Sequence, residues 1–390
     1  MTAPEIELRD PRFQSDRYGY IDEIRAEHTH FRTPDGGHVF LNQDDVMEVF
    51  RCEQFRFAFA DIDETKSPYL ANAIRHELLN MHGDQHFRLS RLVKYALRDR
   101  MIEGMAEVID GIVDDLIAEV KGKQVEFCTT FADPLPARVL GPMFGVPYEK
   151  TDGLNDWIKA GGRKLDALQS GVGIAEVEDA NRNIHDFLRK LLPDRRGAPG
   201  DDLFSELMQA EIDGDRMSED ELVYLSSELA SAGVDTTRTQ LPLILLALLE
   251  HPDEWAKLVA DPKLALRAVD EGMRYAPLPW AIPHAATGDF EWCGVEFKEG
   301  DIAFTLVPAA NRDPAVLNDP HRFNITRDRA RHFAFGYGMH ACPGSQLARM
   351  EMSAALRKLA EQAPNLRLVE HAWDDGQVYR MLKRLVLEVR

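Results

Sequence analysis

A cysteine inside a glycine-rich run is the residue of this chain best placed to do chemistry. Residues 333–344 read Phe-Ala-Phe-Gly-Tyr-Gly-Met-His-Ala-Cys-Pro-Gly, and a helical pattern begins directly after Cys342 and Gly344. Free N–H groups and the dipole at a helix N-terminus favour the thiolate of such a cysteine. A thiolate held there suits the axial position of a haem iron. The alternative is a buried structural cysteine. The presence of Phe335 and His340 in the same short run disfavours it.

An acid and two hydroxyls interrupt an apolar stretch in the middle of the chain. The run Ala-Gly-Val-Asp-Thr-Thr occupies residues 232–237, inside a helical pattern that extends from Ser218 to Glu250. Ser218 and Glu221 form a capping box in front of this pattern, and Pro242 within it predicts a kink. Acid and hydroxyl side chains can deliver protons to an apolar site without admitting bulk water. Taken alone, the segment is equally consistent with a structural helix that packs against a neighbour and whose polar side chains form hydrogen bonds without a catalytic role.

The cysteine run resembles the haem-binding signature F-x-x-G-x-x-x-C-x-G of the cytochrome P450 family. Phe335, Gly338, Cys342 and Gly344 occupy its four defined positions. The resemblance implies that Cys342 is the proximal iron ligand and that Phe335 packs against the haem near the sulfur. It also implies that His340 hydrogen-bonds a haem propionate and that Gly344 belongs to the cofactor-binding loop. The implied cofactor is haem b, iron protoporphyrin IX.

The acid-and-hydroxyl segment resembles the family's A-G-x-D-T-T motif on the distal face of the haem. Under that resemblance Ala232 and Gly233 leave room for dioxygen. Thr236 is expected to donate a hydrogen bond to oxygen bound at the iron, and Asp235 to relay protons to it. Asp235 and Thr236 are therefore the expected catalytic residues.

A second acid–base pair is expected to be structural. Glu271 and Arg274 are three residues apart and share one helical face. A surface ion pair of little energetic weight is one interpretation. The pair also resembles the family's E-x-x-R motif, which implies burial and support of the cysteine loop.

The expected haem edge departs from the family pattern at two positions. His86 matches the histidine of the family's H-T-R-L-R helix, but Ser90 stands where that motif has its last arginine. His284 stands where many relatives have a propionate-binding arginine. A histidine compensates a propionate only when it is protonated, so we expect haem loss to increase above neutral pH. Other residues that could compensate the propionates are Arg88, Arg91, His332 and His340.

The substrate pocket is predicted only through the resemblance, which places the loop 57–79 and the region 157–168 at its border. Trp280 and Met381 could equally well belong to the core. Apolar side chains dominate the predicted lining, which favours an apolar organic substrate held by shape. The individual lining residues are Leu229, Val234, Leu278, Trp280, Ile282 and Met381.

Composition and periodicity predict a mainly α protein with small β-sheets, organised as one unit. The resemblance implies that this unit is a single catalytic domain over residues 1–390. The resemblance implies the cytochrome P450 fold, with haem between a long distal helix and the proximal cysteine loop and helix. Helical patterns cover residues 86–120, 134–146, 174–191, 202–212, 218–250, 253–260, 263–275 and 343–362. Strand patterns cover 38–41, 290–297, 302–307, 366–369 and 384–389, and residues 299–301 predict a hairpin-type turn. A surface connection is expected over 192–200, and a long loop between 308 and 331.

The charge and the cysteine content limit the possible partners and the cellular compartment of the protein. The chain has 46 basic and 66 acidic residues, a net charge of −20, which disfavours binding to nucleic acid. Its four cysteines show no pairwise metal spacing and no disulfide-framework density, which favours a reducing cytoplasm. No apolar run is long enough for a membrane span or a signal peptide.

The predicted function is that of a haem-thiolate monooxygenase acting on a small apolar organic substrate and O2. Electrons are expected from NAD(P)H through a separate ferredoxin-type donor, because no dinucleotide-binding G-x-G-x-x-G segment appears. A local basic patch could dock that donor; it comprises Arg91, Lys94, Arg98, Arg100 and Arg349. Two alternatives stay open: a peroxide-driven or non-oxygenating haem-thiolate enzyme, and a haem-binding sensor without turnover.

Overall fold

The structure is a computed structural model, and it describes residues 3–8, 10–58, 62–146, 152–162, 164, 167, 172–212, 214–373 and 381–390. The main helices are α1 (Arg12–Ser15), α2 (Arg17–Glu27), α3 (Gln43–Arg51), α4 (Pro68–Arg75), α5 (Gly83–Ala96), α6 (Asp99–Gly104), α7 (Ala106–Val120), α8 (Pro134–Met143), α9 (Asp152–Gly162), α11 (Ile174–Gly197), α12 (Leu203–Gln209), α13 (Glu219–Glu250), α14 (Pro252–Ala260), α15 (Ala265–Tyr275), α16 (Val307–Ala310) and α17 (Ser345–Gln362). Short turns of other helix types are η1 (Leu78–Asn80), η2 (Cys128–Ala132), η4 (Pro262–Leu264) and η5 (Gly338–His340). The strands are β1 (His30–Arg32), β2 (His38–Phe40), β3 (Phe55–Phe57), β4 (Gln124–Glu126), β5 (Glu211–Ile212), β6 (Asp215–Arg216), β7 (Ala281–Ala286), β8 (Phe290–Trp292), β9 (Val295–Phe297), β10 (Ile302–Leu306), β11 (Arg367–Trp373) and β12 (Leu382–Glu388).

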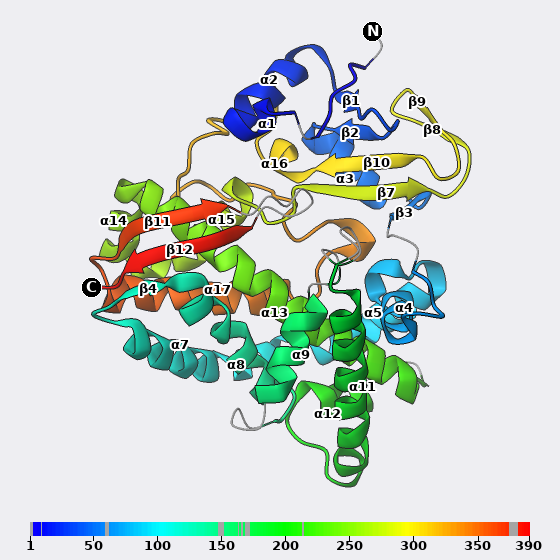
Figure 1. The fold of residues 1–390 in the computed structure, drawn as a ribbon, viewed down its shortest axis with the longest axis vertical. Helices are drawn as coiled ribbons and strands as arrows, with labels where there is room; N and C mark the ends of the chain where they lie inside the picture. The colour runs from blue at the N-terminus through cyan, green and yellow to red at the C-terminus, as the bar shows by residue number, and fades with distance from the viewer. Residues whose placement is uncertain are drawn as a thin grey trace. The chain divides into compact units, whose positions relative to one another are not determined.

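The prediction of a mainly helical protein with small sheets is confirmed (Figure 1). The long predicted helix is α13, and its capping box forms as expected. The Ser218 N–H donates to the Glu221 carboxylate (2.8 Å), and the Glu221 N–H donates to the Ser218 hydroxyl (3.2 Å). Both bonds satisfy donors that a helix start leaves unpaired. The helix continues through Pro242 to Glu250.

Several predicted boundaries were wrong. The single helix expected over 86–120 is divided into α5, α6 and α7. The extended backbone of Arg98 (φ −64°, ψ 161°) separates α5 from α6, and a turn at Met105 separates α6 from α7. Helix α11 includes Pro193 and runs to Gly197, so most of the connection expected over 192–200 is helical. The strand expected over 290–297 is a hairpin of β8 and β9 with its turn at Cys293 and Gly294, both at positive φ.

The chain divides into two compact units, each described here by itself. The first comprises Met1–Phe59, Leu243–Cys342 and Glu370–Leu385. Its sheet has the order β1-β2-β10-β7-β3, in which β10 pairs with β2 in parallel and with β7 in antiparallel orientation (Figure 1). The predicted turn over 299–301 therefore does not pair β9 with β10. Alternate strand positions such as Phe31 and Val39 point into an apolar core, as the two-residue period of a strand requires.

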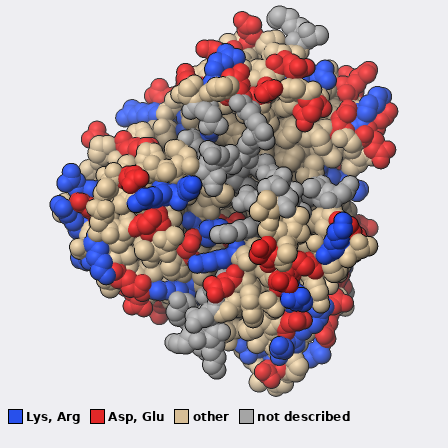
Figure 2. All heavy atoms as spheres, viewed as in Figure 1, with Lys and Arg blue, Asp and Glu red and all other residues tan. Residues whose placement is uncertain are grey.

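The second unit comprises Ala60–Pro242, Pro343–Val369 and Val386–Arg390. Helix α17 packs along α7, and α11 packs against both α9 and α4 (Figure 1). Between α17 and α7, Arg357 bonds Asp110 (2.6 and 2.8 Å) and Lys358 bonds Asp114 (2.7 Å). Within the described part of the chain, no helix is long and apolar enough to cross a membrane. Acidic and basic side chains intersperse over the face shown in Figure 2.

A buried carboxyl group on α17 leads to a prediction about pH. Glu351 is 3% exposed, and burial raises the pKa of its carboxyl from 4.5 to about 8. Glu351 is therefore protonated in the folded protein at pH values where the unfolded chain has released the proton. The folded state binds more protons, so this group's contribution to stability falls as pH rises from about 4.5 to about 8.

The variant Glu351→Gln should flatten that decline, whose steepest slope is about 1.4 kcal/mol per pH unit for one group. The measurement is the free energy of urea unfolding between pH 5 and pH 9. Glu361→Gln, on the same helix but in a surface pair with Arg357, is the matched control and should keep the wild-type slope. Equal slopes for both variants would contradict the assignment.

Candidate functional site

The cysteine loop is shaped by two glycines that no other residue could replace without strain. Gly336 and Gly338 have φ values of +66° and +68°. A Cβ on Gly338 would lie 2.9 Å from the carbonyl oxygen of Phe50, so that position also needs a residue without a side chain. The N–H of Cys342 donates to the carbonyl of Phe335 (2.9 Å). The resulting turn leaves the Cys342 side chain exposed, three residues before α17 begins.

The loop is fixed to the rest of its unit by side-chain hydrogen bonds. The Asn311 amide accepts a hydrogen bond from the Phe333 N–H (2.8 Å) and donates one to the carbonyl of Arg274 (3.2 Å). Arg51 of α3 donates to the Tyr337 hydroxyl (2.9 Å). These contacts hold both the start and the middle of the cysteine loop.

Glu271 and Arg274 of α15 form a bidentate ion pair in the interior of the first unit. Both Glu271–Arg274 bonds measure 2.8 Å, and the side chains are 6% and 1% exposed. Glu271 also accepts from the Asn324 N–H (2.9 Å). The remaining Arg274 donors reach three carbonyls of the long loop, those of Asn311, Pro320 and Arg322. The pair thus organises the loop that leads to Cys342.

His284, on β7, is buried among aromatic rings. Its ring centroid lies 4.9 Å from that of Phe57 and 5.4 Å from that of Phe50. Its Nε2 lies 3.4 Å from the Thr305 hydroxyl. Burial, with a smaller contribution from His340, lowers the pKa of His284 to about 3. His284 is therefore neutral at neutral pH in these surroundings, and the rise in haem loss above pH 7 stays a prediction.

His340 and His86 belong to different units. His340 forms an edge contact with Phe57, at 5.4 Å between ring centroids. His86, on α5, is buried, and burial, followed by the charge of Lys94, lowers the pKa of its ring. Ser90, at the departing position, donates its hydroxyl to the carbonyl of Phe87 (3.2 Å).

Arg88, one of the residues suggested to compensate a propionate, is engaged elsewhere. Its guanidinium bonds Asp215 of β6 (3.2 Å) and forms an ion pair with Glu221 at the start of α13. Since these two carboxylates satisfy it, Arg88 is not placed to serve the haem edge in this arrangement.

The middle of α13 exposes one strip of small residues although most of the helix is buried. Ala232, Gly233 and Thr236 are exposed, whereas Val234 and Thr237 are buried. A Cβ added to Gly233 would have no neighbour within 4 Å. Residues three and four apart share one face of a helix, so this strip borders open space. The Thr236 hydroxyl donates to the carbonyl of Ala232 (2.7 Å), the bond that a helical threonine forms with its preceding turn.

Asp235 lies in an ion-pair network that the sequence analysis missed. Arg238, one turn later on α13, bonds Asp235 through Nε (2.9 Å) and Asp133 through Nη1 (3.2 Å). A Cβ on Gly162 of α9 would lie 3.0 Å from the Asp235 side chain, so a glycine there lets α9 approach. The i, i+3 spacing of Asp235 and Arg238 was a readable signal, but Asp133 lies 105 residues away.

The residues predicted for the substrate pocket are distributed over both units. Trp280 belongs to a core, where Arg17 covers its ring at 4.0 Å. Leu278 and Val234 are buried, whereas Leu229, Ile282 and Met381 are partly buried. Within the predicted bordering segments, residues 59–61, 163, 165, 166 and 168 lie outside the described part of the chain.

The chain's own residues fit a haem in two respects. The Cys342 thiol is exposed at the end of a glycine-shaped loop, and the strip around Gly233 borders open space free of side chains. A Cβ added to Gly344 would likewise meet nothing within 4 Å. A thiolate ligand and glycines that admit a flat ring are what iron protoporphyrin needs from its protein. Fold and motifs together thus define a haem-thiolate oxidoreductase.

Comparisons with known proteins agree with this class. A family model described as Cytochrome P450 matches residues 175–361. The chain is 32% identical to Cytochrome P450 107B1 of Saccharopolyspora erythraea, over 98% of this chain and 97% of that protein. It is 32% identical to the cytochrome P450 monooxygenase PikC of Streptomyces venezuelae, over 97% and 92%. The chain belongs to the cytochrome P450 family.

Solved structures show the same fold. P450BioI, in complex with an acyl carrier protein that carries hexadec-9Z-enoic acid, superposes with a TM-score of 0.88 at 28% identity, covering 97% of this chain and all of that one. The protein is accordingly a cytochrome P450 monooxygenase with a haem cofactor, which acts with O2, an organic substrate and a redox partner.

Proposed function

We propose that this monooxygenase inserts one oxygen atom into an apolar organic substrate, as one catalytic domain supplied with electrons by a separate ferredoxin. The observation that carries the proposal is the exposed Cys342 thiol at the end of its glycine-shaped loop. The apolar nature of the substrate is supported by the apolar residues of the predicted pocket, and by the long-chain acyl group in the P450BioI complex.

Each proposed site residue has a distinct task. Cys342 would hold the haem, which when bound supplies the chemistry of dioxygen reduction and cleavage. Thr236 offers a hydroxyl on the exposed strip of α13, and it can turn that hydroxyl from the Ala232 carbonyl toward the open space. Asp235, one residue earlier, would exchange protons with solvent, and the hydrogen bond from Arg238 fixes the position of its carboxylate.

A prediction about Asp235 follows. Asp235→Asn keeps the size of the side chain but removes its ability to take up and release a proton. Product formation should fall about 100-fold, within the range that a positioned acid or base contributes. Haem content and the carbon monoxide difference spectrum should not change. The measurement is turnover in H2O and D2O, with a larger solvent isotope effect expected in the variant.

The control for this variant is Asp220→Asn. Asp220 lies on the same helix in an exposed pair with Arg189 and should leave turnover unaltered. If Asp235→Asn retains wild-type turnover, Asp235 has no part in proton delivery.

The proposed docking surface for the ferredoxin is the outer face of α5. Phe87 is 62% exposed with Arg91 over its ring (5.4 Å), and Tyr95 is 47% exposed with Arg98 over its ring (4.9 Å). Lys94 is exposed between them. Aromatic groups flanked by cations suit an acidic partner that is steered by charge and held by a small apolar contact. Arg349, also in the proposed patch, donates to the Ser345 carbonyl (3.5 Å), whereas the Arg100 side chain lies outside the described set.

Arg91→Glu should slow electron transfer from ferredoxin about ten-fold at low ionic strength, since a charge at the rim of an interface acts mainly on the association rate. The difference should shrink in high salt, where screening removes steering. Stopped-flow reduction under carbon monoxide measures the rate. The control is Arg367→Glu, an exposed arginine of β11. Identical effects of both substitutions would reject the α5 surface.

The full system tests the proposed function itself. The purified protein is supplied either with NAD(P)H, ferredoxin reductase and ferredoxin, or with hydrogen peroxide alone, in the presence of fatty acids, steroids and macrolides. The proposal is supported if product forms with NAD(P)H, ferredoxin reductase and ferredoxin but not with hydrogen peroxide alone. Product from peroxide alone indicates a peroxide-driven enzyme, and spectral binding without product from either mixture indicates a sensor.

A further inference from the structure

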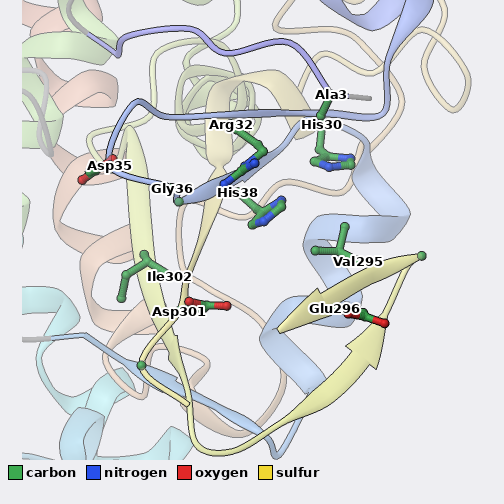
Figure 3. A pocket seen from close by; sticks show the side chains of 13 residues that line it. Ala3, His30, Arg32, Asp35, Gly36, His38, Val295, Glu296, Asp301 and Ile302 are labelled. Carbon is green, nitrogen blue, oxygen red and sulfur yellow. The ribbon is translucent and has the colours of Figure 1, made fainter. Parts of the chain in front are cut away.

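A cavity of about 560 Å³ lies in the first unit, and none of the residues that line it is proposed to hold the haem (Figure 3). It is lined by the hairpin of β1 and β2 on one side, and by the β9 edge and the turn before β10 on the other. Residues that line it include His30, Arg32, His38, Glu296 and Asp301. The opposite face of the hairpin carries Phe31 and Val39, which belong to the core.

The hairpin register gathers three basic side chains on the cavity face. Arg32 pairs directly with His38 across the two strands, and His30 lies two residues before Arg32 on the same face. The rings of His30 and His38 are 5.4 Å apart between centroids. In Figure 3 the Arg32 and His38 side chains extend toward each other at the cavity.

Two polar groups of this cluster have no partner within the described residues. The Arg32 side chain is exposed at the cavity, and its guanidinium forms no hydrogen bond or ion pair with a described side chain. Nδ1 of His38 is buried and has no hydrogen-bond partner in the described part of the chain. Leaving a buried polar atom unsatisfied costs about 1–3 kcal/mol, so such an atom beside a cavity indicates a missing ligand.

The other side of the cavity is acidic. Asp301 stands across from Arg32 and His38 in Figure 3, and Glu296 lies on β9. The Asp301 carboxylate accepts a hydrogen bond from the Lys298 N–H (2.7 Å), which fixes its orientation. Its remaining lone pairs can accept hydrogen bonds from hydroxyl or amine groups. The cavity therefore presents one guanidinium and two imidazole rings on the hairpin side, with Asp35 at the rim, and carboxylate acceptors on the other side.

We propose that this cavity binds a small polar molecule that carries an oxyanion together with hydroxyl groups. The oxyanion, a phosphate or a carboxylate, pairs with the Arg32 guanidinium, whose planar fork matches its oxygens, and accepts a hydrogen bond from the His38 ring. The hydroxyl groups donate to Asp301. This binding site does not depend on the proposed oxidation, because none of its residues belongs to the proposed haem or substrate site.

Binding should be coupled to proton uptake. Burial, and then the charges of His30 and Arg32, lower the pKa of His38 to about 4, while Asp301 acts in the opposite direction. Burial lowers the pKa of His30 as well. The charged groups around the His38 ring are thus His30, Arg32 and Asp301, with Asp35 and Glu296 at the rim. A bound oxyanion favours protonated histidine, so affinity should increase as pH falls from 8 toward 5.

The test is a calorimetric titration of the haem-loaded protein with glycerol 3-phosphate, glycerate, inorganic phosphate and glycerol. Glycerol 3-phosphate should bind several-fold more tightly than inorganic phosphate, and glycerol alone should not bind. The comparison of glycerate with glycerol 3-phosphate identifies the preferred oxyanion. In parallel, NMR signals of the histidine C2 protons should show a change in His38, with its pKa raised.

Two substitutions separate the two ends of the cavity. Arg32→Gln should weaken glycerol 3-phosphate binding at least ten-fold, and Asp301→Asn should remove only its advantage over inorganic phosphate. Arg367→Gln, an exposed arginine on another strand, is the control. The proposal is overturned if Arg32→Gln and Arg367→Gln bind equally, if the His38 signal is unmoved at saturation, or if only a divalent cation such as Zn²⁺ perturbs His30 and His38.

Discussion

The variant Cys342→Ala is expected to lose the thiolate-type Soret band of the reduced, carbon monoxide-bound protein and to form no product above background. The physical reason is that no other cysteine can replace it: Cys128 and Cys52 are only partly exposed, and Cys293 lies in the β8–β9 turn. The Cys342 thiolate would give a bound haem the electron donation that favours O–O cleavage, and alanine cannot supply it. Difference spectroscopy and turnover with ferredoxin and NAD(P)H measure both losses.

Cys293→Ser is the matched control, because Cys293 is also exposed and belongs to the same unit. It should retain the spectrum, the haem and the activity. Circular dichroism on both variants separates a loss of ligation from a loss of folding. A Cys342→Ala protein with an unchanged spectrum and normal turnover would show that the iron ligand lies elsewhere.

Breaking the buried pair of α15 should have the largest effect on stability. Glu271→Gln leaves the Arg274 guanidinium, 1% exposed, without its carboxylate. Removing one partner of a buried ion pair costs about 3–5 kcal/mol, a large fraction of the stability of an ordinary domain. The three loop carbonyls bonded by Arg274 should lose their order as well, and with them the position of the cysteine loop. Urea unfolding and haem retention after gel filtration measure these two effects.

An exposed pair provides the comparison. Lys298 and Asp289, at the start of the β8–β9 hairpin, bond at 2.9 Å with both side chains about two-thirds exposed. Lys298→Ala should destabilise the protein far less than Glu271→Gln, since water already solvates both charges. If Glu271→Gln and Lys298→Ala destabilise the protein equally, the α15 pair is not the support of the loop that its contacts indicate.

Local patterns were sufficient for the elements that are long or strongly marked. The Ser218–Glu221 capping box and the helix behind it are confirmed, because cap and helix depend on residues a few positions apart. The motif around Cys342 likewise lies within one short segment and identified the family correctly. Boundaries inside continuous helical patterns were not predictable in the same way. Arginine is a common residue inside helices, so its type at position 98 gives no sign of a break. Its backbone is nevertheless extended, which separates α5 from α6.

Contacts between segments that are distant in the sequence could not be predicted from local sequence patterns. Three features depend on which segments pack together. They are the Asp133 bond to Arg238, the burial of His284 between Phe50 and Phe57, and the position of Arg32 beside its cavity. His284 illustrates the consequence. A histidine at this position suggested a positive charge near a propionate, whereas burial lowers the pKa of the ring and keeps it neutral. The order of residues along the chain is enough to specify a helix start or a ligand loop, because the groups concerned are covalent neighbours. Ionisation, exposure and partner choice depend on distances through space, and packing of the whole chain sets those distances.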